Sequence, residues 1–200
     1  SFPIIAARKT NLFDRIIVST DNKKIALIAR KFGAETPFLR PAKLSGDKIG
    51  TTDVVSHTIG WLKKNGQHPT AVCCIYPTAV FAKSTDIIKS YKEFKKGKWN
   101  YVFLASMIHS RALRSFEKLS SKGVKMIFPR NYNVRSQNLR LLYYDVGQFY
   151  WGKPKAWLRK VPIFDNLSTI ATVPWNQVCD IDTLEDWNKA EKIYKAIIKK

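Results

Sequence analysis

The sequence predicts an α/β protein whose mostly parallel sheet is flanked by helices. Short apolar runs rich in β-branched residues alternate with segments in which apolar residues recur at helical spacing. Such an alternation is typical of a parallel sheet covered by helices on both faces. The alternation stops between residues 107 and 144, where we expect an arginine-rich insertion beyond the edge of the sheet.

The first elements are predicted to be two strands and a helix. Residues 2–7 are apolar and partly β-branched, which favours a buried strand ending at Arg8. Residues 14–20 favour a second strand. A helix over 25–32 then stops at Gly33.

The short connection between these two strands leaves two interpretations open. Only residues 9–13 separate them, whereas parallel neighbours need a crossover of about a dozen residues or more. Either the strands form an antiparallel hairpin with a turn at Thr10-Asn11, or a segment of the native chain is missing between residues 8 and 9.

The remaining elements belong to the same single domain, residues 1–200, and continue the alternation outside residues 107–144. Thr51 or Thr52 is expected to cap a helix with an apolar stripe over 54–62. Further helices are predicted at 84–94, 155–158 and 184–197, and strands at 71–76, 101–105, 124–128, 145–151 and 169–173. The last helix is expected to bury its apolar residues Leu184, Trp187, Ala190, Ile193, Tyr194 and Ile197.

Charge and composition narrow the class of protein without choosing a function. Thirty-five Lys and Arg against fifteen Asp and Glu give a net charge of +20, which favours acidic partners. The lysines fall in scattered doublets, so a solvated basic face is favoured over a nucleic-acid groove. No apolar stretch reaches the roughly 18 residues that span a membrane, and the start carries no signal-peptide pattern. The three cysteines indicate reduced, buried thiols and a cytoplasmic location.

Two carboxylates near the end of the chain form a candidate metal site. Asp180 and Asp182 alternate at a predicted strand end, and side chains two residues apart point to the same face of a strand. Convergent carboxylates suit Mg²⁺, which completes its shell with water and substrate phosphate. The structural alternative is that Asp182-Thr183 caps the last helix, which leaves Asp180 without a role.

Several motifs, in this order, resemble the cytidylyltransferases that activate sialic acids and related nonulosonic acids, and are most similar to the pseudaminic acid enzymes. The motifs are Leu12-Phe-Asp-Arg-Ile-Ile-Val-Ser-Thr-Asp21, Pro37-Phe-Leu-Arg-Pro41, Cys73-Cys-Ile-Tyr-Pro-Thr78, Arg135-Ser-Gln137, Asp145-Val-Gly-Gln-Phe-Tyr-Trp-Gly152 and Asp180-Ile-Asp-Thr-Leu-Glu-Asp-Trp187. The resemblance implies a Rossmann-like nucleotidyltransferase fold and a homodimer. It also implies transfer of CMP from CTP to the anomeric hydroxyl of a nine-carbon acidic sugar, with release of pyrophosphate.

The resemblance also implies roles for individual residues. Asp180 and Asp182 would hold Mg²⁺ and, with Arg8, would form the catalytic set. The residues implied on the nucleotide side are Arg8, Arg40, Thr51, Pro77 and Thr78. Those implied on the sugar side are Tyr76, Arg135, Gln148, Phe149 and Tyr150.

Four of these residues also have purely structural interpretations, which the sequence leaves open. Arg40 fits a surface ion pair, and Arg135 fits a subunit interface. Phe149 and Tyr150 fit core and strand-edge aromatics. The family further has a glycine- and lysine-rich phosphate loop after the arginine that Arg8 matches. That loop is not found after Arg8, which favours the missing segment described above.

Two other functions remain open from the sequence. An Asp-x-Asp motif on a Rossmann-like sheet also fits a nucleotide-sugar glycosyltransferase, although the motif comes late in this chain. The high net charge fits a binding protein for RNA or an anionic surface, but no RNA-binding motif accompanies it.

Overall fold

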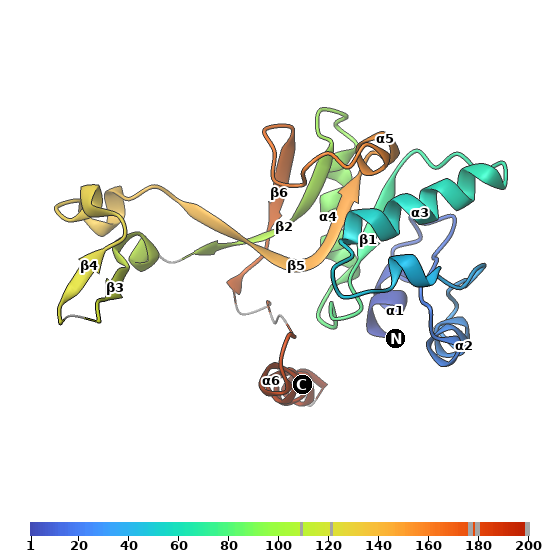
Figure 1. Cartoon of the computed structure of the whole chain (residues 1–200), viewed down its shortest axis with the longest axis horizontal. Helices are drawn as coiled ribbons and strands as arrows, with labels where there is room; N and C mark the ends of the chain where they lie inside the picture. Colours follow the sequence, from blue (N-terminus) through green and yellow to red (C-terminus); the bar gives the residue numbers. More distant parts are fainter. Residues whose placement is uncertain (109, 121, 176–177, 179–180, 199–200) are drawn as a thin grey trace.

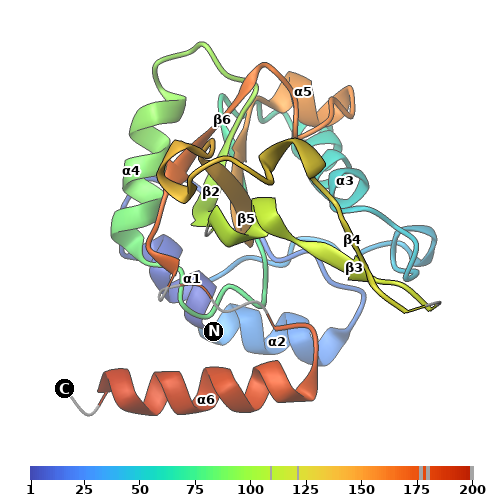
Figure 2. The ribbon, with the colours of Figure 1, turned by 90° about the vertical axis from the view of Figure 1, so that its left-hand side faces the viewer.

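The computed structural model describes residues 1–108, 110–120, 122–175, 178 and 181–198. The body is a sheet between two layers of helices, and a long arm projects from it (Figure 1). Viewed toward the arm, α4 lies on one side of the sheet and α3 on the other, while α6 lies apart from the sheet (Figure 2). No helix of the described chain is long and apolar enough to cross a membrane.

The main sheet is mixed. Its order is β1 (Val72–Ile75), β5 (Leu142–Gly152), β2 (Tyr101–Ile108) and β6 (Ser168–Thr172). Strands β2 and β6 pair in parallel, whereas β5 is antiparallel to both β1 and β2. The α/β class is therefore confirmed, and β1, β2 and β6 share one direction as a parallel sheet requires. The antiparallel β5 lies between β1 and β2, so β2 and β6 form the one parallel pair of neighbouring strands in the described part of this sheet.

Two apolar cores form on the two faces of the sheet. On one face, α4 (Ser84–Phe94) packs against β2, β5 and β6 and also contacts α1. On the other face, α3 (Thr51–Lys64) packs with α5 (Pro154–Leu158) around the fully buried Trp157. The N-cap of α3 is Gly50 and the helix begins at Thr51, so the expected threonine cap is wrong.

The two adjacent cysteines serve these opposite cores because side chains alternate along a strand. Cys73 packs against the α4 core and Cys74 against the α3–α5 core. Removal from water raises the pKa of both thiols, that of Cys74 to about 12. Both thiols are free and both residues are half-buried, while Cys179 lies outside the described residues.

The first predicted strand is wrong, because residues 2–8 form the helix α1 (Phe2–Arg8). A short apolar run fits a buried strand or a buried helix equally well, and Pro3 lies in the first turn, where proline is compatible with a helix. The second predicted strand is extended but makes only one parallel bridge, Ile17 to Glu35. The helix predicted next is confirmed as α2 (Lys23–Lys31), capped by the Asn22 side chain.

This correction removes the spacing argument for a segment missing between residues 8 and 9. The Lys9 amide donates to the Ile5 carbonyl at 3.0 Å, so the backbone continues one helical turn across Arg8. The Asn11 amide then donates to the Arg8 carbonyl at 3.2 Å, closing a turn. A helix followed by an extended segment needs no crossover, so the spacing no longer argues for a missing segment, which stays a prediction.

The insertion predicted at 107–144 is the arm that projects beyond the sheet (Figure 1). Long extensions of β2 and β5 carry it, and its tip pairs β3 (Phe116–Lys118) with β4 (Val124–Met126). Short 3-10 turns complete the arm: Ser110–Arg114, Pro129–Asn131 and Ser136–Asn138. A further 3-10 turn, Ala42–Leu44, lies in the body.

The last helix, α6 (Leu184–Ile198), is confirmed, but its predicted burial is largely wrong. Ala190 is buried, whereas Leu184 is 77% and Trp187 54% exposed. The Tyr194 ring meets the Phe2 ring edge-on at 4.9 Å, which joins α6 to α1. Helical periodicity predicts which residues share a face, but only tertiary contacts decide whether that face is covered.

We expect Gly152→Ala to destabilise the protein, because an added Cβ has no room there. It would lie 2.7 Å from Tyr101 Cδ1 and still closer to the Trp157 indole nitrogen. Overpacking of this kind costs about 1–3 kcal/mol. Chemical denaturation measures the loss.

Gly60→Ala in α3 is the matched control, since its Cβ meets nothing within 4 Å. It should leave stability unchanged or raise it by about 0.5–1 kcal/mol through helix propensity. Equal behaviour of the two variants would contradict the close packing at Gly152.

Candidate active site

Hydroxyl groups gather at the carboxyl end of β1. Tyr76 follows the strand directly, and its amide donates to the Gln148 carbonyl at 2.9 Å. Its hydroxyl lies 2.9 Å from Thr51 Oγ1, in the first turn of α3. Two residues far apart in the sequence thus meet at a sheet end, where open α/β sheets bind their ligands.

A bulge in β5 brings Asp145 and Tyr150 to the same cluster. Between β2 and β5 the register steps from Phe103↔Tyr150 to Ala105↔Asp145, so five positions of β5 pass two of β2. Gly147 takes φ +62° within this bulge, and its amide donates to Asp145 Oδ1 at 3.1 Å. The Tyr150 hydroxyl donates to Asp145 Oδ2. Bulges next to functional sites often redirect a side chain in this way.

The environment of Tyr150 keeps its phenol protonated. Burial raises the pKa of Tyr150, and its hydrogen bond to Asp145, the charge of that carboxylate and the nearby Tyr76 raise it further. The Tyr76 and Tyr150 rings are tilted, with centroids 5.5 Å apart. We call Thr51, Tyr76, Tyr150 and Asp145 the hydroxyl cluster. It brings three of the predicted site residues together with one carboxylate.

The other residues expected around Tyr76 lie near it in the chain or in the sheet, but among the described residues their side chains make no hydrogen bond with the hydroxyl cluster. Pro77 and Thr78 form the turn after β1, where the Val80 amide donates to the Thr78 carbonyl at 2.7 Å. Gln148 is buried beside β1. Phe149 is fully buried in the core on the α4 side, so its position is that of a core aromatic.

Arg40 lies in a polar network formed with residues 19–21. Its guanidinium lies 3.7 Å from Asp21, donates to the Ser19 carbonyl at 3.4 Å and to Ser45 Oγ at 3.2 Å. The ion pair is half exposed on the Asp21 side, so it contributes little to stability. These contacts fix the loop that precedes α3.

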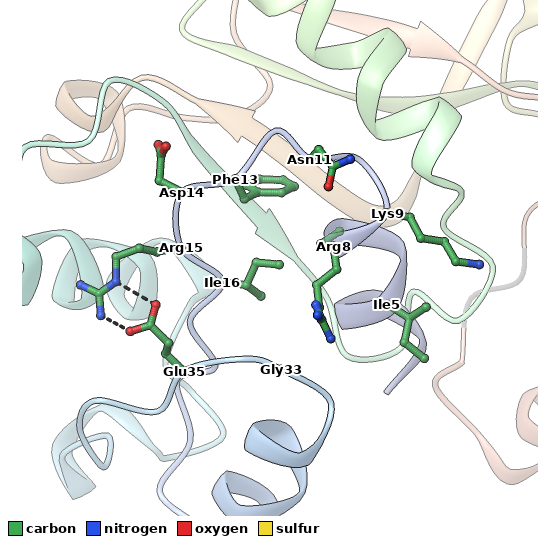
Figure 3. Close-up of a pocket in the computed structure, with 11 residues that line it drawn as sticks. Ile5, Arg8, Lys9, Asn11, Phe13, Asp14, Arg15, Ile16, Gly33 and Glu35 are labelled. Atoms are coloured by element: carbon green, nitrogen blue, oxygen red, sulfur yellow. Dashed lines mark hydrogen bonds and ion pairs between the residues drawn. The ribbon is translucent and has the colours of Figure 1, made fainter.

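Arg8 lines a different region, a cavity of about 540 Å³ between α1, the extended residues 13–16 and the end of α2 (Figure 3). Its guanidinium points toward Gly33 and donates to the Phe32 carbonyl at 3.3 Å. Arg15 in the same cavity is paired with Glu35, which lowers the pKa of that carboxyl. Arg8 therefore ends a helix and not a strand, and its role at the triphosphate stays a prediction.

Arg135 is exposed on the arm, which projects away from the sheet (Figure 1). It precedes the Ser136–Asn138 turn with an extended backbone. The structure therefore does not bring Arg135 to the hydroxyl cluster of its own chain.

Of the two candidate metal ligands, Asp180 lies outside the described residues. Asp182 is exposed, and the described residues make no hydrogen bond or ion pair with its carboxylate. The cap of α6 is Thr183, whose hydroxyl accepts from the Asp186 amide at 3.2 Å. Asp186 in return accepts from the Thr183 amide at 3.0 Å and from its hydroxyl at 2.7 Å. Helix capping thus occupies Thr183 and Asp186 and leaves the Asp182 carboxylate available to a cation.

The fold defines the class as α/β proteins in which a mixed sheet lies between layers of helices (Figure 1). A CMP:2-keto-3-deoxy-manno-octonic acid synthetase solved with CTP has the same fold, with a TM-score of 0.67 over 97% of this chain and 88% of that chain. Its sequence is 11% identical, so this likeness concerns the fold alone.

Sequence comparisons then identify the family. The Cytidylyltransferase family model matches residues 1–148. A pseudaminic acid cytidylyltransferase of Campylobacter jejuni serotype O:2 is 35% identical over 195 residues, 98% of this chain and 84% of that protein. Its counterpart in serotype O:23/36 is 34% identical over the same shares of both chains. The chain belongs to the cytidylyltransferase family and is a nucleotidyltransferase.

We expect acid to weaken the start of α6. The Thr183 hydroxyl and amide hold the pKa of Asp186 below its ordinary value. The carboxylate therefore contributes stability above the ordinary carboxyl pKa of about 3.9, and the contribution is lost as pH falls through the lower folded-state pKa. Amide-exchange protection factors in the first turn of α6 should fall in that window.

Asp186→Asn should remove this pH dependence, whereas Asp182→Asn should leave it in place because Asp182 contributes no carboxylate contact to the cap. A protection profile that follows Asp182 instead of Asp186 would contradict the assignment of the cap.

Proposed function

We propose that this enzyme transfers CMP from CTP to the anomeric hydroxyl of a nonulosonic acid of the pseudaminic acid type and releases pyrophosphate. The observation that carries the proposal is similarity along nearly the whole chain to pseudaminic acid cytidylyltransferases. The proposal includes dependence on Mg²⁺ and a cytoplasmic location, where thiols such as Cys73 and Cys74 stay reduced.

The reaction needs charge stabilisation at the α-phosphate of CTP. Attack by a sugar hydroxyl builds negative charge on the phosphoryl and leaving-group oxygens, and Mg²⁺ bound at the site supplies positive charge there. Asp182 suits this metal because its carboxylate is exposed and is not used by the helix cap. Asp180 is proposed as the second ligand from its place in the sequence.

The hydroxyl cluster provides polar contacts of the kind that orient a substrate. Thr51 and Tyr76 are half-buried at the end of β1, with oxygens at hydrogen-bonding distance from one another. Neutral oxygens in fixed positions give orientation, and orientation supplies a large part of an enzyme's rate enhancement. We assign Thr51, Tyr76 and Tyr150 to the walls of the substrate site.

A pyrophosphate-release assay tests the proposal directly. The protein is mixed with CTP, Mg²⁺ and either pseudaminic acid or N-acetylneuraminic acid. We expect release with pseudaminic acid, a much lower rate with N-acetylneuraminic acid, and none after chelation of Mg²⁺. Release with N-acetylneuraminic acid alone would overturn the assignment of the sugar.

Asp182→Asn in this assay separates metal binding from folding. It should reduce kcat by about a hundredfold or more, as expected when charge stabilisation in a transition state is lost. Its melting temperature should match that of the wild type, and Glu185→Gln in the first turn of α6 is the control. Equal activity of the two variants would remove Asp182 from the site.

The arm is proposed to dock on a second copy of the chain, giving a homodimer. It carries exposed apolar side chains, which are a property of protein interfaces. They are Met107, Phe116, Val124, Ile127, Tyr132 and Leu141. Because the arm holds Arg135 away from its own body, a role for Arg135 at the sugar carboxylate requires the site of the partner.

Sedimentation velocity tests the dimer. We expect the wild type to sediment as a dimer and Val124→Asp, at a residue 63% exposed on β4, to sediment as a monomer. Leu27→Asp on α2, at a residue 51% exposed outside the arm, is the control and should remain a dimer. A monomeric wild type would reject the interface.

A further inference from the structure

Asp145 is a half-buried carboxylate at the centre of the hydroxyl cluster. Its Oδ1 accepts from the Gly147 amide at 3.1 Å, and its Oδ2 accepts from the Tyr150 hydroxyl. Tyr150 is 4% exposed, so solvent does not compete for this bond. This bond also decides whether Tyr150 donates to or accepts from its other neighbours.

The bond to Asp145 fixes the direction of hydrogen bonding. An ionised carboxylate only accepts, and a tyrosine hydroxyl has one proton to donate. Tyr150 donates that proton to Asp145, so its oxygen acts as an acceptor toward any other neighbour. A hydrogen bond to a carboxylate is stronger than one between neutral groups, so the Tyr150 proton stays directed at Asp145.

Tyr76 is the next hydroxyl outward. Its ring is tilted toward that of Tyr150 with centroids 5.5 Å apart, and Tyr76 is among the groups that raise the pKa of Tyr150. Thr51 Oγ1 lies 2.9 Å from the Tyr76 oxygen, and either hydroxyl can be the donor of their bond.

We propose that Asp145 is a positioning residue that fixes Tyr150 as a hydrogen-bond acceptor, so that the cluster it forms with Thr51 and Tyr76 takes an uncharged N–H or O–H group of the substrate. The Tyr150 proton points toward the carboxylate, which leaves the lone pairs of the Tyr150 oxygen for such a donor. The inference rests on the proposed function, since it assigns a task to residues of that site. The competing explanation is that Asp145 only stabilises the bulge through Gly147.

Asp145→Asn separates the two explanations. Asparagine keeps one oxygen to accept from Gly147, but its NH₂ group now donates to Tyr150 and reverses the direction of that bond. We expect kcat/KM to fall by about tenfold or more, the size of one hydrogen bond to a charged group, mainly through KM. A rise confined to the KM of CTP would locate the donor on the nucleotide, and one confined to pseudaminic acid would locate it on the sugar.

Asp165→Asn is the matched control. Asp165 Oδ1 also accepts from a backbone amide two residues on, that of Leu167 at 2.9 Å, but the described residues give it no tyrosine partner. It should leave both KM values unchanged. The comparison holds the turn chemistry constant and varies only the contact with Tyr150.

A substrate-free measurement reports on the contact itself. The Tyr150 hydroxyl proton, donated to a buried carboxylate, should give a protected downfield NMR signal that Tyr150→Phe removes. We expect Asp145→Asn to shift or remove this signal and Asp165→Asn to leave it unchanged. An unchanged signal in Asp145→Asn would overturn the proposal, whatever its kinetics.

A double-mutant cycle completes the test. If Asp145 acts through Tyr150, adding Asp145→Asn to Tyr150→Phe should cause no further loss of kcat/KM, because the coupled pair is already broken. Additive losses, or unchanged KM values in Asp145→Asn, would reject the positioning role. A wild-type protein that releases no pyrophosphate would overturn the proposed function instead, while the hydroxyl signal would still decide the contact between Asp145 and Tyr150.

Discussion

The antiparallel strand β5 is the constraint on which the rest of the structure depends. It is hydrogen-bonded to β1 on one side and to β2 on the other, so it joins the two halves of the sheet. Its outer half leaves the sheet with β2 and carries the arm (Figure 1). Its inner half supplies Phe149 and Trp151 to one core and Tyr150 to the other. The strand β5 is therefore part of the body, the arm and the hydroxyl cluster at once.

The bulge in β5 explains how a structural strand also serves the candidate site. In a regular strand, Asp145 and Tyr150 would point to opposite faces, because they are separated by an odd number of positions. The extra residues opposite Phe103–Ala105 and the positive φ of Gly147 cancel that alternation. The carboxylate then reaches the phenol at the end of β1, beside the first turn of α3.

Most elements follow from local pattern, and the errors have identifiable physical causes. The helices α2, α3 and α4 and the strands β1, β2 and β6 lie close to where periodicity predicts them. The prediction of a strand at residues 2–7 is wrong because a short buried helix and a short buried strand have the same apolar composition. Asp145 was missed as a site residue, although the sequence Asp-x-Gly is a turn signal that points to a bulge.

The sequence by itself determined the alternation of strands and helices, the family, and the candidate residues Thr51, Tyr76, Tyr150 and Asp182. These follow from periodicity and from ordered motifs, which are properties of neighbouring residues. Tertiary structure decided that β5 lies antiparallel between β1 and β2, that Phe149 belongs to the core, and that Arg8 faces Gly33 in a separate cavity. It also decided that Thr183, and not Asp182, caps α6. Each of these depends on contacts between residues distant in the chain or on the exact path of the backbone, which local patterns do not encode.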